Sequence, residues 1–186
     1  MKWALVVIGI IVVAIVCVVA IGYALPVAHV AERSVSVNAP PSTVWATITD
    51  VTAYPTWRPD VDSVEVLAPI EGHQSWRERG ANGEITFAMT TFEPPTRLVT
   101  RIMDRELPFG GEWEYVIVPE GAGSRVTITE RGEVYNPLFR FVSRFVMGHT
   151  AGLETYLAAL STRLSGTAKS AVDAQSGSTV VTPRPG

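Results

Sequence analysis

The chain has 186 residues, of which 47% are hydrophobic and 18% are charged, and its formal net charge is −3 at pH 7. Between residues 28 and 165 it carries seventeen acidic side chains against twelve arginines, and it contains no basic run there. Proteins that bind nucleic acid display a basic patch, so this composition argues against a nucleic-acid partner. The only cysteine, Cys17, lies in an apolar N-terminal segment, so no disulfide can form within the rest of the chain.

The apolar N-terminal segment runs from Trp3 to Leu25 without a charged side chain. In helical form it would be about 35 Å long at ~1.5 Å per residue, enough to cross a hydrocarbon core of about 30 Å. A helix also satisfies every backbone polar group inside lipid. A cleaved signal sequence is the alternative interpretation, but its apolar region covers only about 7–15 residues. We therefore predict a transmembrane anchor and a short linker over residues 1–27.

The charges that flank this segment predict its orientation. Lys2 precedes it, whereas Glu32 and Arg33 follow it and cancel each other. Because positive residues are retained on the cytoplasmic side of a membrane, we expect the N-terminus in the cytoplasm. The sequence thus predicts a single-pass protein of a bacterial plasma membrane whose C-terminal domain lies outside the cytoplasm.

The remainder of the chain divides into two parts of different composition. Residues 28–165 are long enough to bury about two thirds of their surface as one folded domain. Residues 166–186 are rich in Ser, Thr, Ala, Gly and Pro, with almost no large apolar side chains. Such a segment cannot bury enough apolar surface to fold, which predicts a disordered tail.

The domain begins with signals for one strand and two short helices. Residues 29–37 alternate weakly between apolar and polar side chains, which favours a strand. Pro40 and Pro41 suit the first turn of a helix, where a missing N–H costs nothing. Apolar residues then recur at helical spacing, namely Val44, Trp45 and Ile48. Residues 50–57 continue into a second short helix or turn.

Six further segments alternate between apolar and polar residues and are separated by turn-forming residues, as in an antiparallel sheet. They span residues 61–67, 74–79, 84–93, 96–104, 111–119 and 125–134. After Asn136-Pro137 the spacing changes to that of a helix, with apolar residues every three or four positions up to Leu164. We predict one long helix here, which lies across a curved sheet and buries one stripe against it.

The order of these elements and several motifs within them resemble a known fold family. The motifs are Ala39-Pro40-Pro41-Ser42-Thr43-Val44-Trp45, Tyr54-Pro55-Thr56-Trp57-Arg58-Pro59, Gly110-Gly111-Glu112-Trp113-Glu114-Tyr115, Thr127-Ile128-Thr129-Glu130 and Leu153-Glu154-Thr155-Tyr156-Leu157. Over residues 29–164 the chain resembles START-like, helix-grip proteins of the SRPBCC superfamily, in the polyketide cyclase/dehydrase and lipid-transport group. The resemblance implies an α+β fold in which a curved antiparallel sheet of six or seven strands wraps around a long C-terminal helix. It also implies two short helices after the first strand, and a deep apolar cavity between sheet and helix.

Candidates for the wall of this cavity are apolar and aromatic residues that point inward on the strands or face the sheet from the helices. They are Trp57, Trp76, Phe87, Met89, Ile102, Trp113, Tyr115, Phe145, Met147 and His149. A pocket of the usual size, about 300–1,000 Å³, would bind a lipid-like or polycyclic molecule mainly by burying its surface. The alternative is that the same side chains form a closed core.

Polar residues that could support catalysis are few. Glu130 shares strand parity with Ile128 and is expected to point inward, and Asp104 lies at the end of a strand. A buried carboxylate can act as a general acid or base. Either carboxylate could instead form a salt bridge, with Arg79 or Arg101 as the nearest candidates, or lie at a solvated rim.

Motifs for metals and cofactors are missing from the sequence. His29, His73 and His149 are scattered and have no cysteine near them, so they do not form a recognisable zinc-ligand set. The chain also lacks the glycine-rich motifs that bind nucleotide phosphates. We therefore predict neither a metal nor a cofactor.

These observations favour a membrane-anchored protein that binds or transports a small hydrophobic ligand, such as a lipid, an isoprenoid quinone or a polyketide-like molecule. An anchor raises the effective concentration of such a protein near insoluble ligands. One alternative is an enzyme of the cyclase, dehydratase or hydrolase type that uses a pocket carboxylate. Another is a partner-binding domain with a closed core. A non-enzymatic role is favoured, because the sequence shows no partner for the carboxylates, and it carries no signal of oligomeric state.

Overall fold

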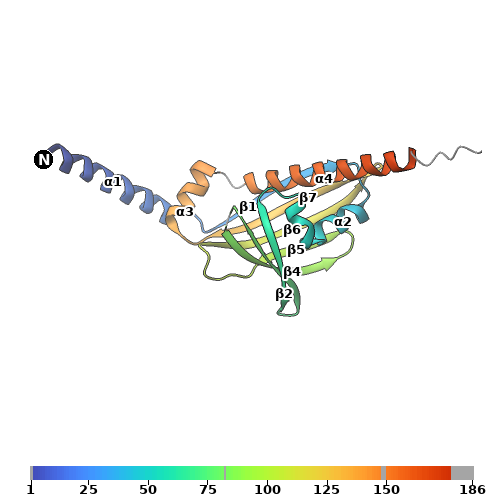
Figure 1. Cartoon of the computed structure of the whole chain (residues 1–186). Helices are drawn as coiled ribbons and strands as arrows, with labels where there is room; N and C mark the ends of the chain where they lie inside the picture. The colour runs from blue at the N-terminus through green and yellow to red at the C-terminus, as the bar shows by residue number, and fades with distance from the viewer. Residues whose placement is uncertain (1, 82, 148–149, 177–186) are drawn as a thin grey trace, which may run out of the picture.

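The computed structural model describes residues 2–81, 83–147 and 150–176, in which one curved sheet is flanked by helices (Figure 1). The helices are α1 (Lys2–Ala24), α2 (Pro41–Thr49), the 3-10 helix η1 (Val51–Thr56), α3 (Pro137–Val142), the π-helix η2 (Ser143–Met147) and α4 (Ala151–Ser176). The strands are β1 (Ala28–Val37), β2 (Val61–Ile70), β3 (His73–Gly80), β4 (Gly83–Glu93), β5 (Arg97–Ile102), β6 (Phe109–Glu120) and β7 (Gly123–Val134).

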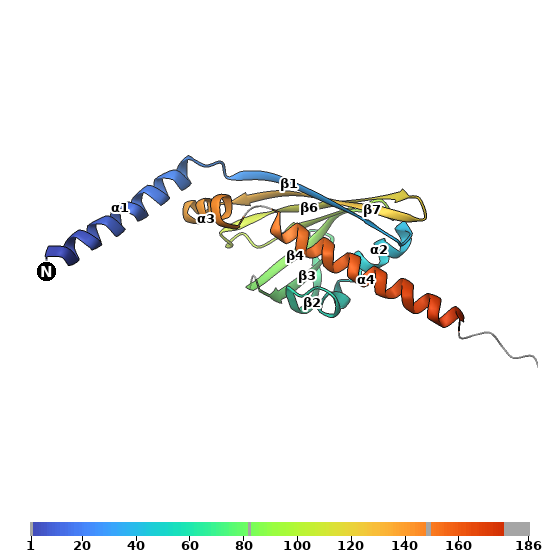
Figure 2. The same cartoon turned by 90° about the horizontal axis from the view of Figure 1, so that it is seen from above.

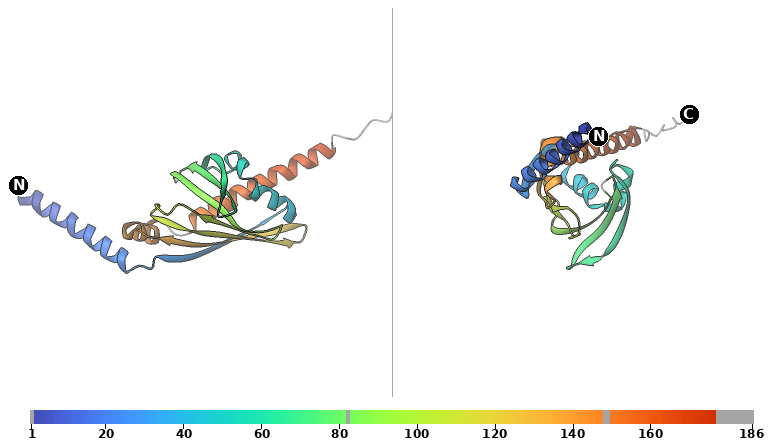
Figure 3. Two further views of the ribbon diagram at one scale, coloured as in Figure 1. Left: turned by 90° about the horizontal axis from the view of Figure 1, so that it is seen from below. Right: turned by 90° about the vertical axis from the view of Figure 1, so that its left-hand side faces the viewer.

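The seven strands form one antiparallel sheet in the order β1-β7-β6-β5-β4-β3-β2. From β2 onward each strand pairs with the next one along the chain, whereas β1 pairs with β7, in register from Ala28 with Glu133 to Val37 with Ser124. The sheet curves, and α2 and α4 lie on its concave side (Figure 3). The predicted α+β fold, with two short helices after the first strand, is confirmed.

The core lies between the concave face of the sheet and the helices α2 and α4. Val44 and Ile48 of α2 are fully buried, and so are Leu153 and Leu160 of α4. They belong to the same cluster as buried strand residues, namely Leu98, Tyr115, Ile117, Val126 and Ile128. α2 begins as predicted with a proline in its first turn, where the absent N–H leaves no backbone donor unpaired.

The prediction of one long C-terminal helix is wrong in one respect, because the helix is divided. α3 begins at Pro137, capped by Asn136 Oδ1, which accepts the Leu138 N–H at 2.9 Å. After η2, a bend at Thr150 separates it from α4, which begins at Ala151. Residues 148–149, between η2 and this bend, lie outside the described residues.

The C-terminal helix also extends beyond the predicted domain boundary at residue 165. α4 continues to Ser176. Alanines at positions 168, 171 and 174 are strong helix formers, and they support this extension although it has few apolar residues to bury. Residues 177–186 of the predicted disordered tail lie outside the described residues, so for them the tail stays a prediction.

The N-terminal helix α1 projects away from the sheet (Figure 1). Its segment Leu5–Ala24 is apolar and long enough to cross a membrane, and almost none of it is buried against the rest of the protein. Membrane anchors and signal sequences share this composition. The last turn of α1 packs against α3 so closely that a Cβ added to Gly22 would lie 2.0 Å from the carbonyl oxygen of Pro137.

Candidate functional site

The concave face of the sheet carries a cluster of aromatic side chains. Predicted wall residues that lie on this face or directly against it are Trp57, Trp76, Phe87, Met89, Ile102, Trp113 and Tyr115. Trp76 stacks on Phe87 with ring centroids 5.5 Å apart, and Trp113 lies edge to face with Tyr156 of α4 at 5.7 Å. Tyr156 also contacts Trp57, at 5.4 Å, so α4 meets the rest of this wall through aromatic rings.

The remaining predicted wall residues come from the divided helix. Phe145 does not join the wall, because its side chain is 60% exposed and its ring packs against Phe141 at 4.9 Å. The prediction assumes one uninterrupted helix on the sheet, whereas α3 has no buried residue and packs against the end of α1. The side chain of Met147 and the whole of His149 lie outside the described residues.

A buried ionic network, which the sequence analysis did not identify, lies beneath the aromatic wall. Arg58 donates from Nη1 to Glu78 Oε1 at 3.0 Å and from Nη2 to Asp60 Oδ2 at 2.6 Å. Trp76 Nε1 donates to the same Glu78 oxygen at 2.8 Å. The side chains of Arg58 and Glu78 are only 11% and 10% exposed. Glu78 shares strand parity with the inward Trp76, so its direction follows from the sequence, but its burial and its partner do not.

The Arg58 guanidinium also lies over two aromatic rings, with its central carbon 4.9 Å from the Tyr54 centroid and 5.3 Å from that of Tyr156. Burial lowers the pKa of Arg58, but the hydrogen bond to Asp60 and the charge of Glu78 outweigh it, so the net shift is upward. The arginine therefore stays charged, and two carboxylates balance that charge. This part of the interior is polar yet electrically compensated.

Two buried donors beside this network have no hydrogen-bond partner among the described residues. They are the indole N–H of Trp57 and the hydroxyl of Tyr156. The hydroxyls of Tyr54 and Tyr115 lie near that of Tyr156 but do not meet hydrogen-bond geometry. An unpaired buried donor costs about 1–3 kcal/mol, so a second molecule that accepts from it would be stabilised here.

A second polar group occupies the end of the concave face nearest α1. His29 Nε2 lies 3.1 Å from Glu130 Oε1, and Trp113 Nε1 donates to Glu130 Oε2 at 3.1 Å. Glu130 thus points inward, as its strand parity predicts, and its side chain is 21% exposed. A Cβ on Gly132 would lie 2.3 Å from the His29 ring, so only glycine leaves room for this pair.

The other predicted carboxylate has a different role. Asp104 Oδ2 accepts a hydrogen bond from the backbone N–H of Thr86 at 2.5 Å. The backbone N–H of Met103 donates to the carbonyl of Thr86 at 2.8 Å. Asp104 thereby ties the segment after β5 to the backbone of β4. Neither Arg79 nor Arg101 pairs with Asp104 or Glu130, because Arg79 pairs with Glu84 and Arg101 with Glu112.

The match to known families covers most of the chain. Residues 28–164 match the family described as polyketide cyclase / dehydrase and lipid transport. The chain belongs to this family. Among curated proteins, no match is found.

Solved structures that resemble this member of the polyketide cyclase/dehydrase family share its START-like fold at low sequence identity. A START superfamily protein from Mycobacterium smegmatis is 21% identical, with a TM-score of 0.59 over 75% of this chain and 99% of its own. Zhui aromatase/cyclase from a Streptomyces species is 17% identical, with a TM-score of 0.60 over 74% and 94%. Norcoclaurine synthase from Thalictrum flavum is 12% identical, with a TM-score of 0.60 over 77% and 98%.

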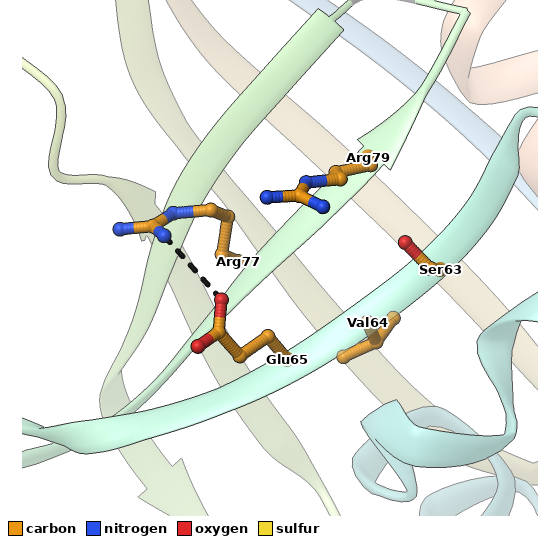
Figure 4. Close-up of a pocket in the computed structure, with 5 residues that line it drawn as sticks. All are labelled: Ser63, Val64, Glu65, Arg77 and Arg79. Carbon is orange, nitrogen blue, oxygen red and sulfur yellow. Dashed lines mark hydrogen bonds and ion pairs between the residues drawn. The ribbon is translucent and has the colours of Figure 1, made fainter.

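A surface hollow between β2 and β3 does not suit the apolar ligands that the description of this family indicates (Figure 4). It has a volume of about 380 Å³ and is lined by Ser63, Val64, Glu65, Arg77 and Arg79. Arg77 Nη1 lies 3.3 Å from Glu65 Oε2, and Figure 4 shows these two side chains pointing toward each other. Because Arg77 alternates with the inward Trp76, the hollow lies on the convex face, open to solvent and away from the aromatic wall.

The three buried tyrosines of the interior predict a distinct alkaline titration. Burial raises the pKa of Tyr54, Tyr115 and Tyr156 well above 10.0. In the unfolded chain these phenols ionise near pH 10, so above that pH the folded state binds more protons and its stability falls as pH rises. We expect these three tyrosines to ionise only when the circular dichroism of the sheet is lost. The absorbance of tyrosinate monitors the ionisation. Ionisation of all five tyrosines while the sheet remains intact would contradict this burial.

Proposed function

We propose that the protein holds a small hydrophobic molecule, such as a lipid, an isoprenoid quinone or a polyketide-like compound, between the concave face of its sheet and α4. The observation that carries this proposal is the pair of unpaired donors, Trp57 Nε1 and Tyr156 Oη, on an aromatic wall. In a closed core each of them would cost about 1–3 kcal/mol with no compensation. A ligand oxygen would satisfy such donors, while the aromatic rings bury the apolar remainder of the ligand.

The chemistry of the wall narrows the class of ligand. An indole N–H can only donate, so the group that faces Trp57 is an acceptor such as a carbonyl oxygen. The nearby Arg58 charge is compensated by Glu78 and Asp60, which leaves no net positive charge for an anionic group. A neutral apolar molecule that carries a carbonyl or hydroxyl oxygen therefore fits this interior better than a fatty-acid anion or a phosphate.

In this proposal α1 anchors the domain to the membrane that supplies the ligand, and the domain lies outside the cytoplasm. Support for the anchor comes from Leu5–Ala24, which is apolar on all sides and almost fully exposed in the protein. The three residues between Ala24 and Ala28 span at most ~3.6 Å each, so the domain stays within about 15 Å of the end of α1. Ligand exchange would thus take place at the membrane surface.

Native mass spectrometry of the full-length protein, extracted from its membrane in mild detergent, tests the proposal. We expect a bound neutral molecule with an oxygen-bearing end, released on denaturation and identified by its mass. A protein that carries no small molecule, and that takes up neither a short-chain quinone nor a fluorescent lipid, would contradict the proposal and favour a closed core. Recovery of the full-length chain in the membrane fraction, with α1 uncleaved, tests the anchor separately.

Tyr156→Phe is expected to change ligand affinity and stability in opposite directions. The variant keeps the ring but removes the unpaired hydroxyl, so the ligand-free protein should be as stable as the parent or more stable. Affinity for a short-chain quinone should fall about twofold to tenfold, the loss of one hydrogen bond. Fluorescence titration with the quinone and urea unfolding without it measure the two effects.

Tyr54→Phe is the matched control for this prediction. Its hydroxyl donates to the carbonyl of Ile48 at 2.7 Å, so its removal leaves that buried acceptor unpaired and should destabilise the protein. A Tyr156→Phe protein that loses stability as Tyr54→Phe does would show that Tyr156 has a partner within the protein, and would count against a ligand at this position.

An enzyme is the second candidate function, and the His29–Glu130 pair favours it. The sequence shows no partner for Glu130, but the structure places an imidazole nitrogen 3.1 Å from its carboxylate, on the inward face. A carboxylate with an adjacent imidazole can take up and release protons, as a cyclase or dehydratase requires. Exchange of carbon-bound hydrogen in the bound molecule for deuterium from heavy water would reveal such chemistry. Glu130→Gln should abolish the exchange, and its absence in the parent protein would leave binding as the function.

A further inference from the structure

The segment formed by α3 and η2 lies beside the end of α1 (Figure 2) and carries exposed apolar side chains. They are Leu138, Phe139 and Phe145, which are 49%, 51% and 60% exposed, and we call these three residues the α3 patch. Phe145 packs on the partly buried Phe141 with ring centroids 4.9 Å apart, which holds its ring on this surface. Single exposed apolar side chains are common in proteins, but three large ones within eight residues of one helical segment favour a surface that contacts another molecule.

The α3 patch is held against the last turn of α1. Gly22 packs on the first residue of α3, where an added Cβ would lie 2.0 Å from the Pro137 oxygen. Arg140 Nη1 donates to the carbonyl of Leu25 at 3.0 Å, and Nη2 donates to that of Tyr135 at 3.1 Å. α3 is therefore joined both to the end of α1 and to the end of β7, and its depth relative to α1 is set by these contacts.

This depth coincides with the membrane surface if α1 crosses the bilayer. The 20 residues Leu5–Ala24 rise about 30 Å, which matches the hydrocarbon thickness, and the full apolar run from Trp3 to Leu25 exceeds it by only about 5 Å. The last turn of α1, and with it Pro137, then lies at the boundary between acyl chains and headgroups. Tyr23, in the last turn of α1, and Tyr135, two residues before α3, are 70% and 46% exposed, and amphipathic aromatic rings are favoured at a membrane surface.

We propose that the α3 patch is a second membrane contact, which inserts into the same leaflet in which α1 ends. The proposal rests on the proposed anchoring by α1. In this proposal lipid covers the apolar sides of α1. The α3 patch extends the apolar surface of α1 at the depth of the membrane interface, where a helix buries its apolar face about 5–10 Å into the headgroup boundary. The occupant is therefore the bilayer surface.

Two contacts orient the domain, whereas a single helix leaves it free to tilt. β1 begins at Ala28 and β7 ends at Val134, both next to α3, so His29, Glu130 and Trp113 lie at the membrane-proximal end of the interior. α4 starts there as well, and its Gly152 approaches Trp113, with 3.7 Å between an added Cβ and the ring. The α3 patch thus holds this end of the fold against the leaflet from which a hydrophobic ligand would come.

Depth-dependent fluorescence quenching in nanodiscs that hold one full-length protein each tests the proposal. In a Cys17→Ala background, single cysteines are introduced as Leu138→Cys or Phe145→Cys and labelled with an environment-sensitive fluorophore. Ile11→Cys in the middle of α1 and Ala122→Cys in the exposed turn between β6 and β7 serve as references. The discs contain phosphatidylcholine and phosphatidylglycerol with a nitroxide placed either near the headgroup or at the end of the acyl chain.

We expect the shallow nitroxide to quench positions 138 and 145 severalfold, the deep nitroxide to quench position 11, and neither to quench position 122. Quenching at position 11 without quenching at 138 and 145 would overturn the second contact and leave the anchor intact. Loss of quenching at position 11 would overturn the anchor itself, and the second contact with it. The same labels can be measured in vesicles that hold several proteins each. If the fluorophores at positions 138 and 145 are shielded from water there but not in the single-protein nanodiscs, the α3 patch contacts a second copy of the chain, and the proposal is overturned.

Discussion

Replacing Arg58 by methionine is expected to lower the free energy of unfolding by about 3–5 kcal/mol, the usual cost of removing one partner from a buried ion pair. The arginine donates to Glu78 at 3.0 Å and to Asp60 at 2.6 Å, and the Glu78 side chain is only 10% exposed. Without the guanidinium, the Glu78 carboxylate retains only the Trp76 N–H, and its charge is left uncompensated in the interior. Urea unfolding of the full-length protein in detergent, followed by tryptophan fluorescence, measures the loss.

The double variant Arg58→Met and Glu78→Met separates this loss from a simple loss of packing. It removes both charges of the pair and should recover part of the stability, since a buried pair replaced by apolar residues is often tolerated. Arg77→Met is the control, because Arg77 is the neighbour of Glu78 in β3 but lies on the opposite face of the sheet. Arg77 forms a salt bridge with Glu65, and the two side chains are 36% and 61% exposed. Exposed pairs of this kind contribute about 0–1 kcal/mol to stability. Equal losses from Arg58→Met and Arg77→Met would contradict the buried network.

Leu160→Ala should cost about 2–5 kcal/mol, because Leu160 is fully buried where α4 lies on the sheet. The side chain belongs to a single core cluster with Leu153, Leu157 and Leu164, the stripe that holds α4 in place. The exposed Thr162→Ala on the same helix is the control, with an expected change within about 0.5 kcal/mol. Urea unfolding compares the two variants.

A cost at the low end of this range would itself be informative. The penalty for a large-to-small substitution grows with the cavity that remains, and it shrinks where neighbouring side chains collapse into the space. If the interior already contains a void or a bound ligand next to α4, repacking is easier than in a dense core. A loss below about 1 kcal/mol would contradict the burial of Leu160 altogether.

The strands and short helices could be predicted because their signals are local. Alternation with a period of two places Trp76 and Phe87 on the same face, and their stacking follows from that parity and the hairpin between them. The pairing of β1 with β7 joins residues about a hundred positions apart in the chain, such as His29 and Glu130. Periodicity contains no information on such a pairing, so the strand order of the sheet was not predicted.

The buried polar network could not be predicted from the same patterns. Arg58 and Glu78 come from different elements, and only the fold shows that they meet away from water. From the sequence alone, a charged side chain at an inward position can lie either in the core or at a solvated rim, because its burial depends on what covers it. Tyr156 lies at the right helical spacing, but its unpaired hydroxyl is a property of its neighbours and not of its position.

The misplacement of Phe145 has a different cause. The pattern of apolar residues every three or four positions continues through this region, so an α-helical periodicity was extended across it. The segment formed by α3 and η2 lies against the end of α1 and not on the sheet, and α3 has no buried residue. Phe145 therefore faces outward, where it now forms part of the α3 patch.

The pairing of β1 with β7 also determines how the protein would respond to mechanical load. If α1 anchors the chain in a membrane, as proposed, the covalent connection from the membrane to the domain enters at Ala28, the first residue of β1. Force then runs along the strand, so the pairs from Ala28 with Glu133 to Val37 with Ser124 are loaded together in shear. A strand that is sheared must break its hydrogen bonds nearly at once, whereas a strand that is peeled loses them one pair at a time. A pull directed along β1 would therefore meet the combined resistance of all the pairs that join it to β7.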